Sequence, residues 1–303
     1  MASTPATWLS GYIPDLPTPF DADGAVDLRA FQRLCERQIE AGVAAIVVSE
    51  TAGEASTLSP AEQGRLIRAA ADVARGRARI IAGTGSNSTQ QAIELTRCAD
   101  AAGADAVLSV VPYYNKPMQA GIEAHFLAIA DATELPIILH DVPSRTIREL
   151  ADTTLARLAQ SGQFIGLKDG TGDVTRVSRL RRLLPACFRL MSGDDPSALA
   201  FLANGGDGCI SMVSNVAPRL CRMIFSSCRH ENWQPARALH NRLAPLEALL
   251  SRDGAPALKA AMSGLGLMRP DVRLPLVQLD GATAREIARA AASIGEPDLA
   301  HAS

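Results

Sequence analysis

The chain has 303 residues, of which 47% are hydrophobic and 20% charged, a balance typical of a folded globular protein with a large core. Its formal net charge is −2, so no overall basic field favours binding to nucleic acid or to an anionic membrane surface. The apolar runs are short and interrupted by glycine, proline or charge, which argues against a transmembrane helix.

The N-terminal stretch and the cysteines bear on where the protein works. The first 20 residues have no basic segment and no long apolar run, so they do not have the pattern of a signal peptide. The six cysteines are scattered without a C-x-x-C pair, and we expect them to be free thiols in a reducing compartment. These features together predict a cytoplasmic protein.

Short apolar runs alternate with helical patterns along the chain. Runs such as IIAG, VLSVV and PIILH do not alternate polar with apolar residues, which is typical of strands buried on both faces of a parallel sheet. Strand–helix units that repeat near the ~30 residues of a βαβ unit predict a closed (β/α)₈ TIM barrel rather than an open sheet. The eight predicted strands are residues 12–17, 45–49, 79–83, 106–110, 136–140, 164–168, 188–192 and 208–211.

Several helix ends are marked by local signals. Asp27 is placed to cap a helix that buries Phe31, and the run S-P-A-E at 59–62 has the pattern of a capping box with proline at the first helical position. After about residue 230 no strand pattern remains, and we expect the barrel with its active site over residues 1–230 and a C-terminal helical region over 231–303. The predicted helices of that region are residues 232–251, 255–267 and 282–294.

Lys168 is the first candidate catalytic residue, because barrel enzymes place catalytic groups at the C-terminal ends of strands. It ends the sixth predicted strand, where its ammonium should be partly desolvated. Desolvation lowers the pKa of a lysine, and attack on a carbonyl requires a neutral amine. The residues alone leave two interpretations open, a Schiff-base nucleophile and a rim lysine paired with Asp169 or another carboxylate.

Three more polar side chains follow predicted strand ends. Arg145 could grip a carboxylate through two parallel hydrogen bonds, or it could be a solvated loop arginine. His140 and Tyr114 are candidate proton carriers, with a satisfied core histidine and a packed aromatic ring as the alternatives.

The segment after the second predicted strand is a candidate anion site. Thr51, together with the backbone N–H groups of Ala52 and Gly53, could bind a carboxylate as a turn-like nest. The glycine-rich residues 83–88 lack the ending and the spacing of a phosphate-binding loop, so we interpret them as a tight turn into a capped helix.

In this order, the motifs resemble those of the dihydrodipicolinate synthase / N-acetylneuraminate lyase superfamily, and most closely its dihydrodipicolinate synthase branch. The resemblance extends from about residue 11 to about residue 294. It implies a (β/α)₈ barrel with a C-terminal helical part, usually assembled as a homotetramer that is a dimer of dimers. The matching motifs are TAGEASTL (51–58), IAGTGSNST (81–89), PYYNKP (112–117), VPSRT (142–146), IGLKDGTGD (165–173), LMSGDD (190–195) and NGGDGCIS (204–211).

The resemblance also implies roles for individual residues. Lys168 is implied to be the Schiff-base lysine, and Arg145 to hold the carboxylate of the second substrate, aspartate semialdehyde. Thr51 and Tyr114 are implied to belong to a proton relay, in which the tyrosine reaches the neighbouring subunit's site. Two further positions are implied to form the pocket wall near bound pyruvate, namely Gly193 and Ile210.

Three features depart from the family pattern. The family usually has G-T-T-G-E after the second strand, where this chain has E-T-A-G-E (50–54). Ala52 cannot offer a hydroxyl to the pyruvate carboxylate, a loss of about 1–3 kcal/mol in a buried site. Glu50 is expected to add a charge near the site mouth. The fifth strand usually ends in Tyr-Asn, so His140, with a reference pKa near 6.5 instead of about 10, is expected to carry protons in place of the relay's tyrosine.

The predicted activity is a lyase reaction, in which Lys168 forms an imine with pyruvate and the derived enamine attacks an aldehyde held by Arg145. The resemblance implies L-aspartate 4-semialdehyde as the aldehyde and 4-hydroxy-tetrahydrodipicolinate, of lysine biosynthesis, as the product. No metal or organic cofactor is implied, because the lysine imine is itself the electron sink. The expected partners are these small molecules and further copies of the chain, with no nucleic acid and no membrane.

Two alternatives to this reaction stay open. One is another class I aldolase or hydratase of the same superfamily, acting on a different 2-oxo acid or a sugar acid. The other is a pyruvate-binding paralogue that is catalytically weakened or inactive.

Overall fold

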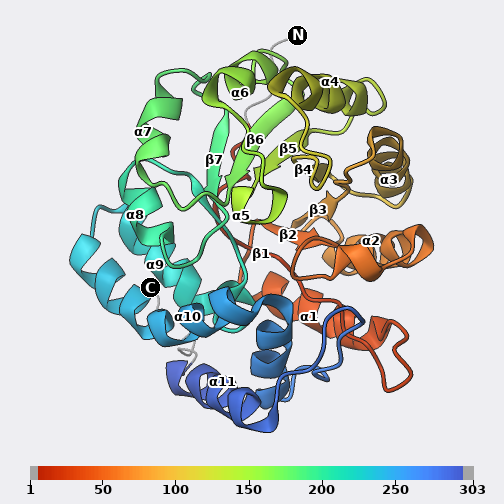
Figure 1. Cartoon of the computed structure of the whole chain (residues 1–303). Coiled ribbons are helices and arrows are strands. Elements are labelled where there is room, and N and C mark those ends of the chain that lie inside the picture. The colour runs from red at the N-terminus through yellow and green to blue at the C-terminus, as the bar shows by residue number, and fades with distance from the viewer. Residues whose placement is uncertain (1–5, 296–303) are drawn as a thin grey trace.

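A closed barrel of eight parallel strands forms the centre of the computed structural model, which describes residues 6–295. The strands run in the order β1-β8-β7-β6-β5-β4-β3-β2. A parallel bridge between Asp15 and Val47 joins the two edge strands, which confirms the predicted barrel (Figure 1). The strands are β1 (Gly11–Pro14), β2 (Ala45–Val48), β3 (Arg79–Gly83), β4 (Ala106–Val110), β5 (Ile137–Asp141), β6 (Phe164–Asp169), β7 (Arg189–Ser192) and β8 (Gly208–Ser211).

Two apolar cores explain why the strands are apolar at nearly every position. Side chains alternate between the two faces of a strand. Ile13, Val47 and Ile138 point into the barrel and belong to its inner core. Ile46 and Leu139 point outward and pack in the larger core between the barrel and the helices. The sheet therefore has no solvated face.

Helices surround the barrel and begin where the sequence predicts caps. The Asp27 side chain accepts a hydrogen bond from the Ala30 N–H, and Ser59 forms the capping box with Glu62. The surrounding helices are α1 (Leu28–Glu40), α2 (Pro60–Ala74), α3 (Thr89–Ala101), α4 (Gln119–Ala130), α6 (Asp152–Leu158), α7 (Thr175–Arg181), α8 (Ala198–Ala203) and α9 (Pro218–Arg229). Shorter turns are η1 (Ala55–Thr57), α5 (Pro143–Thr146) and η2 (Val213–Asn215).

The C-terminal part is helical and packs on one side of the barrel (Figure 1). It consists of α10 (Trp233–Gly264) and α11 (Gly281–Ile294), which pack against each other. A kink at Gly254, with φ 61° and ψ −134°, interrupts α10 close to the predicted break between two helices. Within residues 6–295, no helix is both long enough and apolar enough to cross a membrane.

Candidate active site

A cavity of about 630 Å³ opens at the C-terminal ends of the strands. This is the end at which barrel enzymes bind their substrates, and the volume suits a small molecule. Glu50, Thr51 and His140 line the cavity from strand ends, and Arg145 lines it from α5. Gly254 also lines the cavity, and a Cβ there would lie 3.8 Å from Nη2 of Arg145, so the kink in α10 contributes to the site.

Lys168 lies at the end of β6 and is in contact with two carboxylates. Its Nζ is 3.0 Å from Oε2 of Glu50 and 3.3 Å from Oδ2 of Asp15, and its side chain is 6% exposed. Burial lowers the pKa of Lys168, but the two carboxylates more than offset this effect and hold the pKa above its ordinary value. The expectation that desolvation alone yields a neutral amine is therefore wrong. In the unliganded site Lys168 is an ammonium, which must lose a proton before it attacks a carbonyl.

Glu50 lies inside the site and not at its mouth, which corrects the expectation from the sequence. A left-handed residue, Ser49 with φ 56°, directly precedes it, and Glu50 is only 8% exposed. Its Oε2 accepts a hydrogen bond from the backbone N–H of Thr51, and its Oε1 lies 2.9 Å from Nδ1 of His140. Burial raises the pKa of Glu50, but Lys168 and His140 lower it well below its usual range. Glu50 is therefore an ionised bridge between Lys168 and His140.

His140 and Asp15 complete this cluster. Burial and the Lys168 charge lower the pKa of His140 below its ordinary value, against the opposite effect of Glu50, so the imidazole is neutral at pH 7. Asp15 follows β1, is 1% exposed and lies within hydrogen-bond reach of Glu50. Burial raises the pKa of Asp15 well above its usual range, although Lys168 acts in the other direction. Asp15 was missed from the sequence, where its signal is a single charge within the apolar run YIPDLP.

The predicted carboxylate nest is occupied in part by the chain's own carboxylates. The Thr51 N–H donates to Glu50, and the Ala52 N–H donates to Oδ2 of Asp15 at 3.5 Å. A Cβ at Gly53 would lie 3.1 Å from the Leu16 carbonyl oxygen, so a larger residue here would push against the backbone of Leu16. An incoming carboxylate would thus compete with Glu50 and Asp15 for the first two donors.

Arg145 is the cation that faces the cavity without a protein partner. It is exposed, and its charge contributes to lowering the pKa of His140. Within residues 6–295 its guanidinium forms no ion pair with a carboxylate. The cation is therefore available to a ligand carboxylate.

Lys168 is not among the residues that line the cavity but contacts Glu50, which lines it, and the other predicted site residues also lie outside the cavity wall. Tyr114 is 88% exposed with a left-handed φ of 72°, so the single chain does not bring it to Lys168. A Cβ at Gly193 would lie 3.1 Å from Cγ of Lys168, which shows that Gly193 packs against the lysine stem. Ile210 is 2% exposed and belongs to the inner barrel core.

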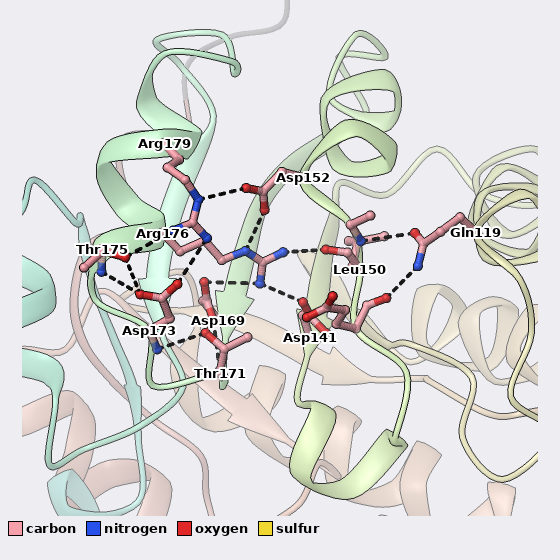
Figure 2. Close-up of polar contacts among 12 residues, drawn as sticks. Gln119, Asp141, Leu150, Asp152, Asp169, Thr171, Asp173, Thr175, Arg176 and Arg179 are labelled. Carbon is pink, nitrogen blue, oxygen red and sulfur yellow. Dashed lines mark hydrogen bonds and ion pairs between the residues drawn. The ribbon is translucent and has the colours of Figure 1, made fainter.

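One arginine holds the two strand ends that carry His140 and Lys168. Arg176 of α7 donates from Nη1 to Oδ2 of Asp141 at 2.7 Å and to Oδ2 of Asp169 at 3.4 Å (Figure 2). Because neighbouring side chains on a strand point to opposite faces, Asp141 and Asp169 face the helices while His140 and Lys168 face the inside of the barrel. This contact gives a structural role to Asp141, which stands where the family usually has asparagine. It also shows why Asp169 is not the partner of Lys168.

Replacing Arg176 by methionine is expected to lower the free energy of unfolding by about 3–5 kcal/mol, because it leaves buried carboxylates without their cation. The Arg176 side chain is 5% exposed. Arg179, on the same helix, is 46% exposed and offers a matched control, since its surface ion pairs should contribute little. Denaturant titrations of both variants test this expectation, and equal midpoints for Arg176→Met and Arg179→Met would contradict it.

Comparisons with known proteins agree with this fold. The model of the Dihydrodipicolinate synthetase family matches residues 8–294. A 4-hydroxy-tetrahydrodipicolinate synthase from Hyphomonas neptunium is 49% identical, with 94% of this chain and 98% of the relative aligned. A 4-hydroxy-tetrahydrodipicolinate synthase from Thiobacillus denitrificans is 47% identical, with 93% of this chain and 95% of the relative aligned. The crystal structure of the chloride-inhibited dihydrodipicolinate synthase from Acinetobacter baumannii, complexed with pyruvate, is 41% identical with a TM-score of 0.91, covering 94% of this chain and 99% of that one.

Proposed function

Because the chain belongs to the dihydrodipicolinate synthetase family, we propose that it is a class I lyase that condenses pyruvate with an aldehyde through an imine on Lys168. The observation that carries this proposal is the position of Lys168, buried at the mouth of the barrel beside proton-accepting groups. The names of the relatives point to L-aspartate 4-semialdehyde as the aldehyde and 4-hydroxy-tetrahydrodipicolinate as the product.

The residues of the site can perform each step. The Lys168 amine attacks the carbonyl carbon of pyruvate, and the carbonyl oxygen leaves as water with two of the former ammonium protons. Loss of a proton from the methyl carbon converts the iminium into an enamine. The enamine carbon then bonds to the aldehyde carbon, whose oxygen takes up a proton. We place His140, Thr51 and Tyr114 among the carriers of these protons, and Ala52, Gly53, Gly193 and Ile210 around the bound pyruvate.

A second candidate activity is supported by the carboxylates beside Lys168. Glu50 and Asp15 already accept hydrogen bonds from the Thr51 and Ala52 N–H groups, which are the donors expected to hold the pyruvate carboxylate. Together with the departures from the family pattern at residues 50–52 and 140–141, this arrangement keeps a different 2-oxo acid or a sugar acid as the second candidate substrate. A panel of 2-oxo acids and aldehydes, assayed for turnover, separates the two candidates. Imine trapping with pyruvate but without consumption of any aldehyde would instead indicate a pyruvate-binding paralogue.

The proposed enzyme is a cytoplasmic homotetramer, a dimer of dimers, that needs no metal or organic cofactor. Tyr114 supports assembly, because an 88% exposed aromatic ring on a left-handed backbone suits contact with another copy of the chain. Light scattering after size-exclusion chromatography measures the assembly directly. A monomer with full turnover would remove Tyr114 from the catalytic residues.

Arg145→Ala is expected to weaken use of the aldehyde while leaving imine formation intact. A charge-assisted pair with a carboxylate contributes about 1.5–3 kcal/mol, so kcat/KM for the aldehyde should fall roughly 10- to 100-fold. Arg148→Ala is the matched control, since Arg148 is exposed and lies outside the cavity wall. Steady-state kinetics with each substrate varied in turn test the assignment. An equal loss in pyruvate trapping would show that Arg145 does not belong to the second substrate.

A further inference from the structure

We propose that Glu50 is the acid–base group that moves protons at the Lys168 imine, with Asp15 as the carboxyl that shares its proton. This inference deepens the proposed function and rests on it, because it concerns the same imine. It assigns a catalytic role to a position that departs from the family pattern.

The geometry places one carboxylate between the nucleophile and the imidazole. Oε2 of Glu50 is 3.0 Å from Nζ of Lys168, and Oε1 of Glu50 is 2.9 Å from Nδ1 of His140. The side chains of all three residues are less than 10% exposed, at 9% for Glu50, 6% for Lys168 and 4% for His140. A buried carboxylate within hydrogen-bond distance of the reacting nitrogen meets the geometric requirement for a general base.

The charge of the cluster leaves one proton to be shared. Two carboxyl groups, Glu50 and Asp15, lie against the single ammonium of Lys168 in a buried site. Two like charges this close cannot both be ionised at low cost, so one carboxyl keeps its proton. Glu50 has three nitrogen partners and Asp15 has two more distant ones, so the pKa of Glu50 is lowered while burial raises that of Asp15, and the shared proton belongs with Asp15. The two carboxyl groups can therefore act together, with the ionised Glu50 accepting a proton and the protonated Asp15 donating one.

Glu50 can then exchange protons directly with the reacting atoms, while His140, Thr51 and Tyr114 remain the other proposed proton carriers. Glu50 takes a proton from the Lys168 ammonium, which frees the amine for attack on carbon 2 of pyruvate. A second proton of the former ammonium moves from the attacking nitrogen to the carbonyl oxygen to give the carbinolamine, and the protonated Glu50 then donates its proton to this hydroxyl, which leaves as water. As the carboxylate again, Glu50 removes a proton from the methyl carbon, and the C–H electron pair forms the enamine double bond. That proton is finally passed to the aldehyde oxygen when the new carbon–carbon bond forms.

Solvent exchange at the pyruvate methyl group isolates the step assigned to Glu50. In D₂O with pyruvate alone, proton NMR follows the loss of the methyl signal, and borohydride trapping measures the imine independently. Glu50→Gln keeps the size of the side chain and removes its basicity. We expect exchange to fall by about 10²–10⁴-fold, while the trapped adduct still accumulates at equilibrium. The matched control is Glu40→Gln, since Glu40 is an exposed residue at the end of α1.

Several results would overturn the assignment. Exchange at the wild-type rate in Glu50→Gln would show that Glu50 only fills the site. Faster exchange with tighter pyruvate binding would show that its carboxylate obstructs the substrate. If Glu50→Gln does not fold, Glu50→Asp keeps the charge but draws the oxygens back by one methylene, and unchanged exchange in that variant would equally reject the role. Failure of the wild type to form any adduct would instead reject the proposed function itself.

Discussion

Lys168→Ala is expected to reduce condensation to background, a loss on the order of 10⁶-fold in kcat, because removal of a catalytic nucleophile removes the covalent pathway. The chain has only three lysines, so few amines could substitute for it. Lys259 is fully buried, paired with Glu54 and placed 4.0 Å from the centre of the Phe20 ring. Steady-state assays with pyruvate and the aldehyde measure the loss in kcat.

Lys168→Arg is the control for this variant. Alanine would leave Glu50 and Asp15 buried without a cation, which could destabilise the barrel for reasons unrelated to catalysis. Arginine keeps the positive charge but cannot form the imine. We expect Lys168→Arg to fold with near-normal thermal stability and to be as inactive as Lys168→Ala. Turnover by either variant above a few per cent of the wild type would contradict the covalent mechanism.

His140→Phe is expected to slow turnover by about 10²-fold, near the lower end of the general acid–base range because Glu50 remains beside Lys168. The imidazole is buried and 2.9 Å from Glu50, so the substitution removes a proton-carrying group and a partner of that carboxylate. His140→Tyr is the matched comparison, because tyrosine differs from phenylalanine only by its hydroxyl. The tyrosine variant should retain more activity than the phenylalanine variant.

Rate measurements across pH and circular dichroism on both variants test this role. A folded His140→Phe protein with an unchanged rate would remove His140 from the mechanism. Equal rates for the phenylalanine and tyrosine variants would show that only the shape of the ring matters.

Much of the fold could be predicted because its signals are local. The runs at β3 (Arg79–Gly83), β4 (Ala106–Val110) and β8 (Gly208–Ser211) have the predicted bounds, since strands buried on both faces consist of continuous apolar residues between turn signals. The barrel also places the strand ends together, so the convergence of His140, Lys168 and Arg145 at one end followed from their positions along the chain.

The electrostatics of the site could not be predicted in the same way, because they depend on contacts across the barrel. Asp15 and Lys168 are 153 residues apart in the chain and touch only when the barrel is closed. Their contact reverses the expected direction of the Lys168 pKa. The direction of the Glu50 side chain depends on the turn at Ser49, which carries no distinct sequence signal. Arg176 carries no distinct sequence signal, because its role depends on α7 placing it against Asp141 and Asp169.

Borohydride reduction with pyruvate, followed by peptide mass mapping, tests the imine on Lys168 most directly. The three lysines, Lys116, Lys168 and Lys259, lie far apart in the sequence, so each falls on a separate peptide. Lys259 is an internal comparison, because burial lowers its pKa to about 8, so it is the more easily deprotonated amine, although it is fully buried against Glu54. We predict a single reduced pyruvyl adduct on the Lys168 peptide. An adduct on Lys259 or Lys116, or none on any lysine, would contradict the imine mechanism.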